Sequence, residues 1–133
     1  MVKRFENWPK LLSDYLIERK KMPFEWGKND CLLFVAGAIL AVSGQDFREE
    51  YSTEEEANEI LKKYGGIIGM ISDRLGHEGS ENVRMAGRGD VVVAYLPELA
   101  AGVVDDSGRF FCSVTKEGLT KHPISVAQHY WEY

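Results

Sequence analysis

The chain has 133 residues, of which 44% are hydrophobic and 28% charged, a composition typical of one folded domain with a sizeable core. Its formal net charge of −5 argues against a general nucleic-acid-binding surface or an anionic-membrane surface. The longest apolar run, residues 31–42, is shorter than the ~20 residues that a membrane-spanning helix needs. We therefore expect a single domain over residues 1–133, with neither nucleic acid nor membrane as a partner.

Cysteines and histidines are few and scattered. Cys31 and Cys112 cannot form a framework of disulfides, and because no signal peptide is evident, we expect reduced thiols in a cytosol. Neither cysteine belongs to a Cys-x-x-Cys pair, and the histidines stand far apart at His77, His122 and His129. The sequence therefore predicts no bound metal and no cofactor.

The first half of the chain begins with two predicted helices. Apolar side chains recur at three- and four-residue steps over residues 5–20, which predicts an amphipathic helix. Its regular part should start near Trp8, because Pro9 suits the first turn of a helix. Residues 30–42 are apolar on nearly every side, which predicts a helix that is buried all round.

Two shorter helices are expected next. Residues 51–64 offer Ser52 or Thr53 as a cap, glutamates in the first turn and lysines in the last turn, which is ordinary helix electrostatics. Residues 67–75 predict a fourth helix, followed by an exposed loop over residues 76–82.

The second half of the chain changes to β-branched and apolar runs separated by turn residues. The expected strands cover residues 91–96, 100–104, 109–114 and about 119–122. A last helical turn is expected over residues 125–130. Helices followed by an antiparallel meander define an α+β domain.

Cys31 stands in the first turn of the predicted buried helix. Asp30 can cap this helix, because its carboxylate can accept from the free N–H groups of the first turn. The positive end of the helix dipole favours a thiolate at Cys31, and a thiolate on a rigid helix start is one way to build a nucleophile. A buried, inert cysteine would give the same pattern, since free cysteine is among the most buried residue types.

Three short motifs follow one another along the chain. An Asp-Cys pair opens an apolar helix at residues 30–35, Arg-Gly-Asp-Val opens the first strand at 88–91, and Ala-Ala-Gly-Val lies in the second strand at 100–103. This series resembles the NlpC-type family of papain-like cysteine peptidases, which are peptidoglycan hydrolases and are also found as phage tail-assembly proteins. The resemblance spans the chain from about residue 20 to its end.

A second set of motifs narrows the resemblance. Trp-Gly-x-x-Asp-Cys covers residues 26–31, Tyr-Gly-Gly covers 64–66, and Trp131 lies near the C-terminus. These features are similar to those of short phage and prophage proteins that themselves resemble the NlpC-type family. The resemblance implies a papain-like NlpC-type fold, in which a buried Cys-bearing helix packs on a C-terminal antiparallel sheet.

The resemblance also implies a catalytic site. Cys31 would be the nucleophile of a hydrolase that cleaves amide bonds in peptidoglycan, with Asp30 beside it in the expected catalytic set. The base histidine of the family would stand at Ala100, and alanine cannot take a proton from a thiol. We therefore expect His122, at a strand end in the same sheet, to act as a displaced base.

Other residues complete the expected site. Trp26, Asn29 and Tyr95 are expected to bind substrate, with Trp26 and Tyr95 as walls of the site. His129 is a second candidate for the base. Asp90 could orient a base, although an Asp after Gly at the entrance of a strand is more often a turn former.

Three functions remain open on the sequence. The first is the hydrolase, and the second is a catalytically inactive domain of the same fold that acts in phage tail assembly or as a protein-binding module. The third is an acidic interaction protein in which Cys31 has no inherited role. The expected partners are phage tail proteins or peptidoglycan peptides, and the expected location is the cytoplasm of the infected or lysogenic host, or the virion tail.

Overall fold

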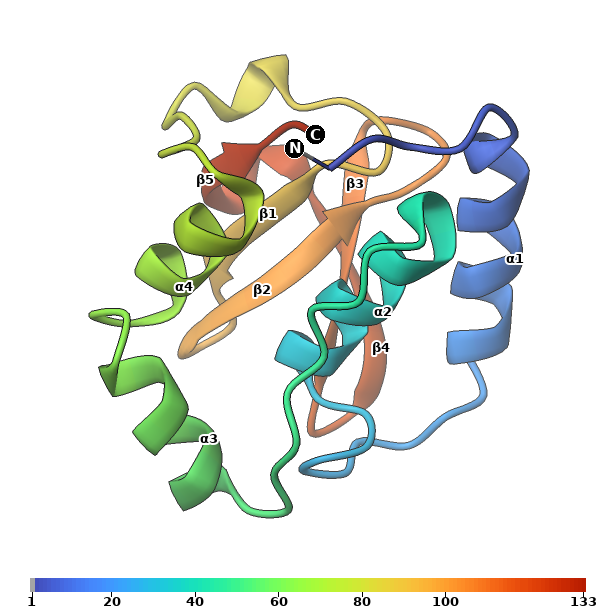
Figure 1. Cartoon of the computed structure of the whole chain (residues 1–133). Helices are drawn as coiled ribbons and strands as arrows, with labels where there is room; N and C mark the ends of the chain where they lie inside the picture. The colour runs from blue at the N-terminus through green and yellow to red at the C-terminus, as the bar shows by residue number, and fades with distance from the viewer. Residues whose placement is uncertain (1) are drawn as a thin grey trace.

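In the computed structural model, which describes residues 2–133, four α-helices precede a five-stranded antiparallel sheet (Figure 1). The helices are α1 (Trp8–Arg19), α2 (Cys31–Ser43), α3 (Glu54–Lys62) and α4 (Ile67–Leu75). The strands are β1 (Val91–Tyr95), β2 (Leu99–Val104), β3 (Phe110–Thr115), β4 (Gly118–Pro123) and β5 (Ala127–Trp131). They lie in the order β4-β3-β2-β1-β5. The expected α+β class is confirmed.

Helix α2 forms as its sequence predicts. Asp30 caps the helix, its Oδ1 accepting from the N–H of Leu33 at 3.0 Å. Gly44 ends the helix with φ of 78°, a left-handed conformation that glycine adopts without steric cost. Because nearly every side chain between these ends is apolar, α2 is surrounded by α1 and by strands β2 and β3.

The two faces of the sheet have separate cores. The face that packs on α2, called the α2 face here, carries Val91, Val93 and Ala101 within the main hydrophobic cluster. The other face, called the outer face, carries Val92 and Phe111 in a second cluster, next to the short 3-10 turns Val83–Met85 and Ile124–Val126. Alternate residues of one strand therefore serve two cores.

The prediction of a helical turn over residues 125–130 is wrong. A 3-10 turn over Ile124–Val126 leads into β5, which pairs antiparallel with β1. Tyr130 and Trp131 are buried on opposite faces of the sheet, the alternation that a strand produces. The edge of β1 that faces away from β2 is buried, so its backbone polar groups need the partner that β5 supplies.

The two intermediate helices lie close to their expected positions. Thr53, rather than Ser52, caps α3, and its hydroxyl accepts from the N–H of Glu56 at 3.2 Å. The bounds of α4 are those expected, and Gly76 ends it. No helix within residues 2–133 is both long enough and apolar enough to cross a membrane.

Arg4 joins both ends of the chain to the entrance of β1. Its guanidinium lies between the rings of Trp8 and Tyr133, 4.4 Å from each centroid. It also donates to Asp90 Oδ1 and to the carbonyl of Arg88, both at 2.7 Å. The N–H of Gly87 donates to Asp90 Oδ2 at 2.8 Å, so Asp90 is the turn former that its position after glycine indicates, and it also holds the N-terminal segment.

Candidate functional site

Asp30 is fully buried, with 0% of its surface exposed, and its carboxylate is occupied by structural partners. It accepts from the N–H of Leu33, from the N–H of Gly27 at 3.0 Å and from the hydroxyl of Tyr51 at 2.7 Å. These bonds join the loop before α2, the helix start and the segment before α3. Asp30 therefore organises the site without a free oxygen for proton transfer.

Asn29 has a similar structural role. It is 1% exposed, and its amide nitrogen donates to the carbonyls of Met22 and Pro23. Its side-chain oxygen accepts from Nη1 of Arg19 at 2.8 Å. Both polar atoms of the Asn29 side-chain amide are therefore hydrogen-bonded, and the bond from Arg19 of α1 fixes the loop that precedes Cys31.

Cys31 is the first residue of α2 and is half-buried as a whole, with its side chain packed against the main hydrophobic cluster. Desolvation by burial raises the pKa of Cys31 to about 11, and the neighbouring charge of Asp30 acts in the same direction. Hydrogen bonding to the backbone of Ala101, and at the helix start, opposes this shift without overcoming it. The thiol is therefore protonated at neutral pH.

The strand position that meets the thiol is Ala101, not Ala100. Ala101 pairs with Val93, and both belong to the cluster on the α2 face. Ala100 pairs with Ala94, which belongs to the outer-face cluster. Directly opposed residues of neighbouring strands share a face, so the side chain of Ala100 is directed away from Cys31. Whether the family's histidine is aligned with Ala100 or with Ala101, the residue at that position is an alanine.

His122 lies on the wrong face of the sheet to pair with Cys31. It is directly opposed to Phe111 across β3 and β4, and their ring centroids are 5.3 Å apart. Phe111 belongs to the outer-face cluster, whereas Cys31 packs on the α2 face. The imidazole contacts the hydroxyl of Thr120 at 2.7 Å. The structure does not bring the expected displaced base to the nucleophile, because strand alternation places the sheet between them.

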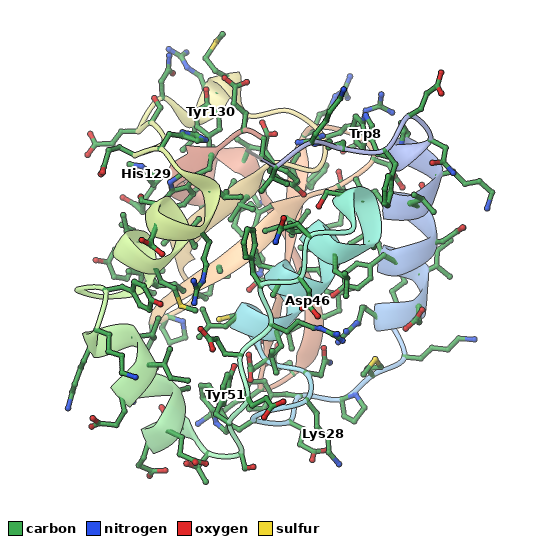
Figure 2. All side chains as sticks on the ribbon, viewed as in Figure 1. Trp8, Lys28, Asp46, Tyr51, His129 and Tyr130 are labelled. Atoms are coloured by element: carbon green, nitrogen blue, oxygen red, sulfur yellow. The ribbon has the colours of Figure 1, made fainter. Side chains whose placement is uncertain are left out.

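The other two histidines also have partners of their own. His129 opposes Val93 on the α2 face, but β5 is the second strand from β2, about 10 Å across the sheet. Its Nε2 contacts the carbonyl of Glu78 at 2.7 Å. Figure 2 shows His129 well away from Tyr51, the partner of Asp30. The ring of His77 contacts the carbonyl of Glu132 at 2.7 Å.

The expected substrate walls do not converge on one pocket. Trp26 is partly buried, and its ring stands edge-on to Phe24 with centroids 5.2 Å apart. Tyr95 is 63% exposed at the end of β1. Trp26 therefore contributes to the packing of the loop before α2, and Tyr95 is a surface residue.

The remaining candidate groups add no reactive centre. Cys112 is buried on β3, and desolvation raises its pKa to about 11. Within residues 2–133, no three His, Cys, Asp or Glu side chains are grouped so that they could hold a metal ion.

Three features of the site escape sequence reasoning. Tyr51 and Arg19 hold Asp30 and Asn29, but neither carries a local signal, since each contact joins separate elements of the fold. Ala101 could not be chosen over Ala100 from strand alternation, because Val103 and Val104 are both fully buried and the strand therefore packs on both of its faces.

The chain matches the family described as "Domain of unknown function (DUF6950)" over residues 3–133, and it belongs to that family. No curated protein and no solved structure matches the chain.

Proposed function

We propose that this member of the DUF6950 family is a papain-like, NlpC-type domain without hydrolase activity that serves as a protein-binding module in phage tail assembly. One observation carries the proposal: Cys31 meets an alanine of β2, and each histidine of the chain is engaged elsewhere. A thiol without a base remains a poor nucleophile at neutral pH.

The arrangement of elements supports the papain-like part of the proposal. The buried helix α2 lies against the antiparallel meander (Figure 1). Cys31 is its first residue and contacts the backbone of Ala101 in β2. The helices precede the sheet, as the resemblance to NlpC-type proteins implies. This placement supports the assignment of α2 as the counterpart of a nucleophile helix.

The electrostatics of the loop support the inactive part of the proposal. Asp30, adjacent to the thiol, further raises the pKa of Cys31, whereas a working cysteine nucleophile needs a neighbour that lowers it. The contacts of Asp30 with Tyr51 and Leu33 give the Asp-Cys motif a structural role that does not depend on catalysis. The motif begins a helix and fastens a loop.

A cysteine hydrolase acting on peptidoglycan peptides is the second candidate. It is favoured by the position of Cys31 at a helix start, where backbone hydrogen bonding with Ala101 and Leu32 stabilises a thiolate. This contribution is smaller than the desolvation that raises the pKa. The hydrolase therefore requires a base that none of the three histidines provides in this conformation.

Purified peptidoglycan sacculi separate the two candidates. We expect the wild-type protein to release no more soluble peptide than the Cys31→Ala variant at pH 7, because the thiol has no base. An established NlpC-type hydrolase serves as the positive control. Release by the wild type that is lost in Cys31→Ala would overturn the inactive reading.

The assembly role is tested in a phage or prophage that encodes the protein. We expect deletion of the gene to lower the yield of infectious particles and Cys31→Ala to restore it in full, because the module works through binding. A Cys31→Ala phage that behaves like the deletion, or a deletion with normal yield, would contradict this role.

A further inference from the structure

A small cavity lies beside α2, and Ala101, whose backbone contacts the Cys31 thiol, forms part of its wall. It is lined by residues of α2, α3, α4 and β2 and by the segment of residues 44–53. This segment crosses in front of α2 with no helix or strand of its own (Figure 1). Its volume is about 50 Å³. The apolar part of its wall includes Leu33, Ala36, Ile39, Ile60, Ile71 and Ala101.

The size and lining of the cavity limit what can enter. A water molecule takes up about 30 Å³ in the liquid, and a dry apolar cavity of about 150 Å³ admits benzene. A cavity of about 50 Å³ therefore has room for two or three carbon atoms. Because its wall is mostly aliphatic, a small alkyl group is a better occupant than water.

Two charged side chains also line the cavity, and they pair with each other. Nη2 of Arg74 donates to Glu49 Oε1 at 2.6 Å and to the hydroxyl of Tyr64 at 3.0 Å. The side chains of Arg74 and Glu49 are each 30% exposed, so solvent reaches the pair. The Nε of Arg74 is buried and finds no hydrogen-bond partner among residues 2–133.

On the edge of the Arg74 guanidinium that carries Nε and Nη2, only Nη2 therefore has a hydrogen-bond partner. The N–H groups of Nε and Nη2 form a fork that matches the two oxygens of a carboxylate. Glu49 takes Nη2 alone and leaves Nε as a buried donor, which costs free energy. A second carboxylate bound to both nitrogens would satisfy the donor that Glu49 leaves.

We propose that this cavity binds a carboxylate attached to a small branched alkyl group, with the alkyl group in the cavity and the carboxylate on Nε and Nη2 of Arg74. In the free protein the carboxylate of Glu49 binds Nη2 of Arg74, and the carboxylate of the ligand displaces it on binding. Its segment has no regular secondary structure, so Glu49 can move toward solvent without breaking a helix or strand. Figure 2 places Asp46 and Tyr51 along this segment.

This ligand chemistry has two sources. One is a free branched-chain acid, and the other is the end of a peptide whose last residue has a small side chain. Isobutyrate represents the first, and N-acetylalanine, with the same methyl group beside a carboxylate, represents the second. Isobutyramide has nearly the shape of isobutyrate without its charge and tests whether the carboxylate matters.

The experiment is a titration of the full-length, 15N-labelled protein with each compound, followed by amide chemical shifts. We expect saturable shifts at residues of α2 and α4, and binding of isobutyramide at least about tenfold weaker than that of isobutyrate. Tighter binding of N-acetylalanine assigns the site to a peptide end, and tighter binding of isobutyrate to a free acid. The proposal is overturned if neither acid gives saturable shifts, or if isobutyramide binds equally well.

Variants of the pair sharpen the test. Glu49→Gln removes the competing carboxylate and should tighten binding about tenfold, whereas Arg74→Lys removes the fork and should weaken it about tenfold. Ala36→Val narrows the cavity and should abolish binding. The matched control is Asp46→Asn, which alters a carboxylate of the same segment paired with Arg48 and should leave affinity unchanged. If Arg74→Lys does not fold, Glu49→Gln decides, and unchanged or weaker binding there contradicts the proposal.

Discussion

Asp30 is buried next to the thiol and accepts from two backbone N–H groups and from the hydroxyl of Tyr51. The capping bond could be predicted from the sequence, because an Asp before an apolar helical run is a local signal. The bond from Tyr51 could not, since it joins residues 21 positions apart through the tertiary fold. A carboxylate with three structural donors is a poor candidate for proton transfer.

We expect Asp30→Ala to lower the free energy of unfolding by about 2–4 kcal/mol, because a lost cap costs about 1 kcal/mol and orphaned buried donors a further 1–3. Urea unfolding followed by circular dichroism measures the change. Asp30→Asn should lose less, since Asn caps as well as Asp. The control is Asp14→Ala, whose exposed carboxylate pairs only with Lys10. Equal stabilities of Asp30→Ala and Asp14→Ala would refute the structural role.

At the scale of elements, the packing of α1 on α2 includes a close approach at Gly37. The hydroxyl of Tyr15 donates to the carbonyl of Phe34 at 2.6 Å, and its ring covers Gly37. A Cβ added at Gly37 would lie 2.3 Å from the Tyr15 hydroxyl oxygen. The sequence predicts both helices but does not reveal that glycine in the middle of α2 makes room for Tyr15.

Gly37→Ala should therefore destabilise the protein, although Ala is the better helix former by about 1 kcal/mol. We expect a net loss of about 1–3 kcal/mol from overpacking against Tyr15. Tyr15→Phe removes the atom that clashes first, so a double-mutant cycle should show a smaller loss for Gly37→Ala in the Tyr15→Phe background. Additive losses would mean that the hydroxyl does not set the spacing of the helices.

The sheet shows where local patterns are sufficient. The apolar runs of β1 to β4 predict strands to within one residue at most ends, whereas the C-terminal run was expected to be helical. Ala127–Trp131 forms a strand because the free edge of β1 needs a hydrogen-bonding partner. This is a tertiary requirement, and the local sequence of residues 127–131 gives no sign of it. The failure at His122 has a similar origin, because pairing register decides which face a side chain occupies.

At the scale of the whole molecule, Arg4 fastens both termini to the sheet. We expect Arg4→Ala to lower the free energy of unfolding by about 2–4 kcal/mol, because it leaves the mostly buried Asp90 carboxylate without its cation and removes packing between Trp8 and Tyr133. Thermal unfolding measures the loss. Arg4→Lys should lose less stability than Arg4→Ala but more than none, since the lysine ammonium is not planar and cannot stack between the two rings. Lys10→Ala, at an exposed ion pair, is the control and should change little.

Alkaline pH should destabilise the fold. Burial raises the pKa of Cys31 and of Cys112 from 9.0 to about 11, and it also raises the pKa of Tyr15 and Tyr51. The folded state therefore holds protons that the unfolded state releases, so stability is complete below about pH 9 and falls as pH rises through about 11. Urea midpoints measured from pH 7 to 11 should decline above pH 9. A midpoint that rises or stays level over this window would contradict these shifts.

The most direct test of the central claim, that Cys31 is a protonated and unassisted thiol, is the pH dependence of its alkylation by iodoacetamide in a Cys112→Ser background. A pKa raised from 9.0 to about 11 predicts a thiolate population about 100-fold below that of an ordinary cysteine at neutral pH. The rate should rise steadily toward pH 11, and His122→Ala should not change it. A reactive thiolate with a midpoint below pH 8, lost on replacing any of the three histidines, would contradict the account and restore the hydrolase.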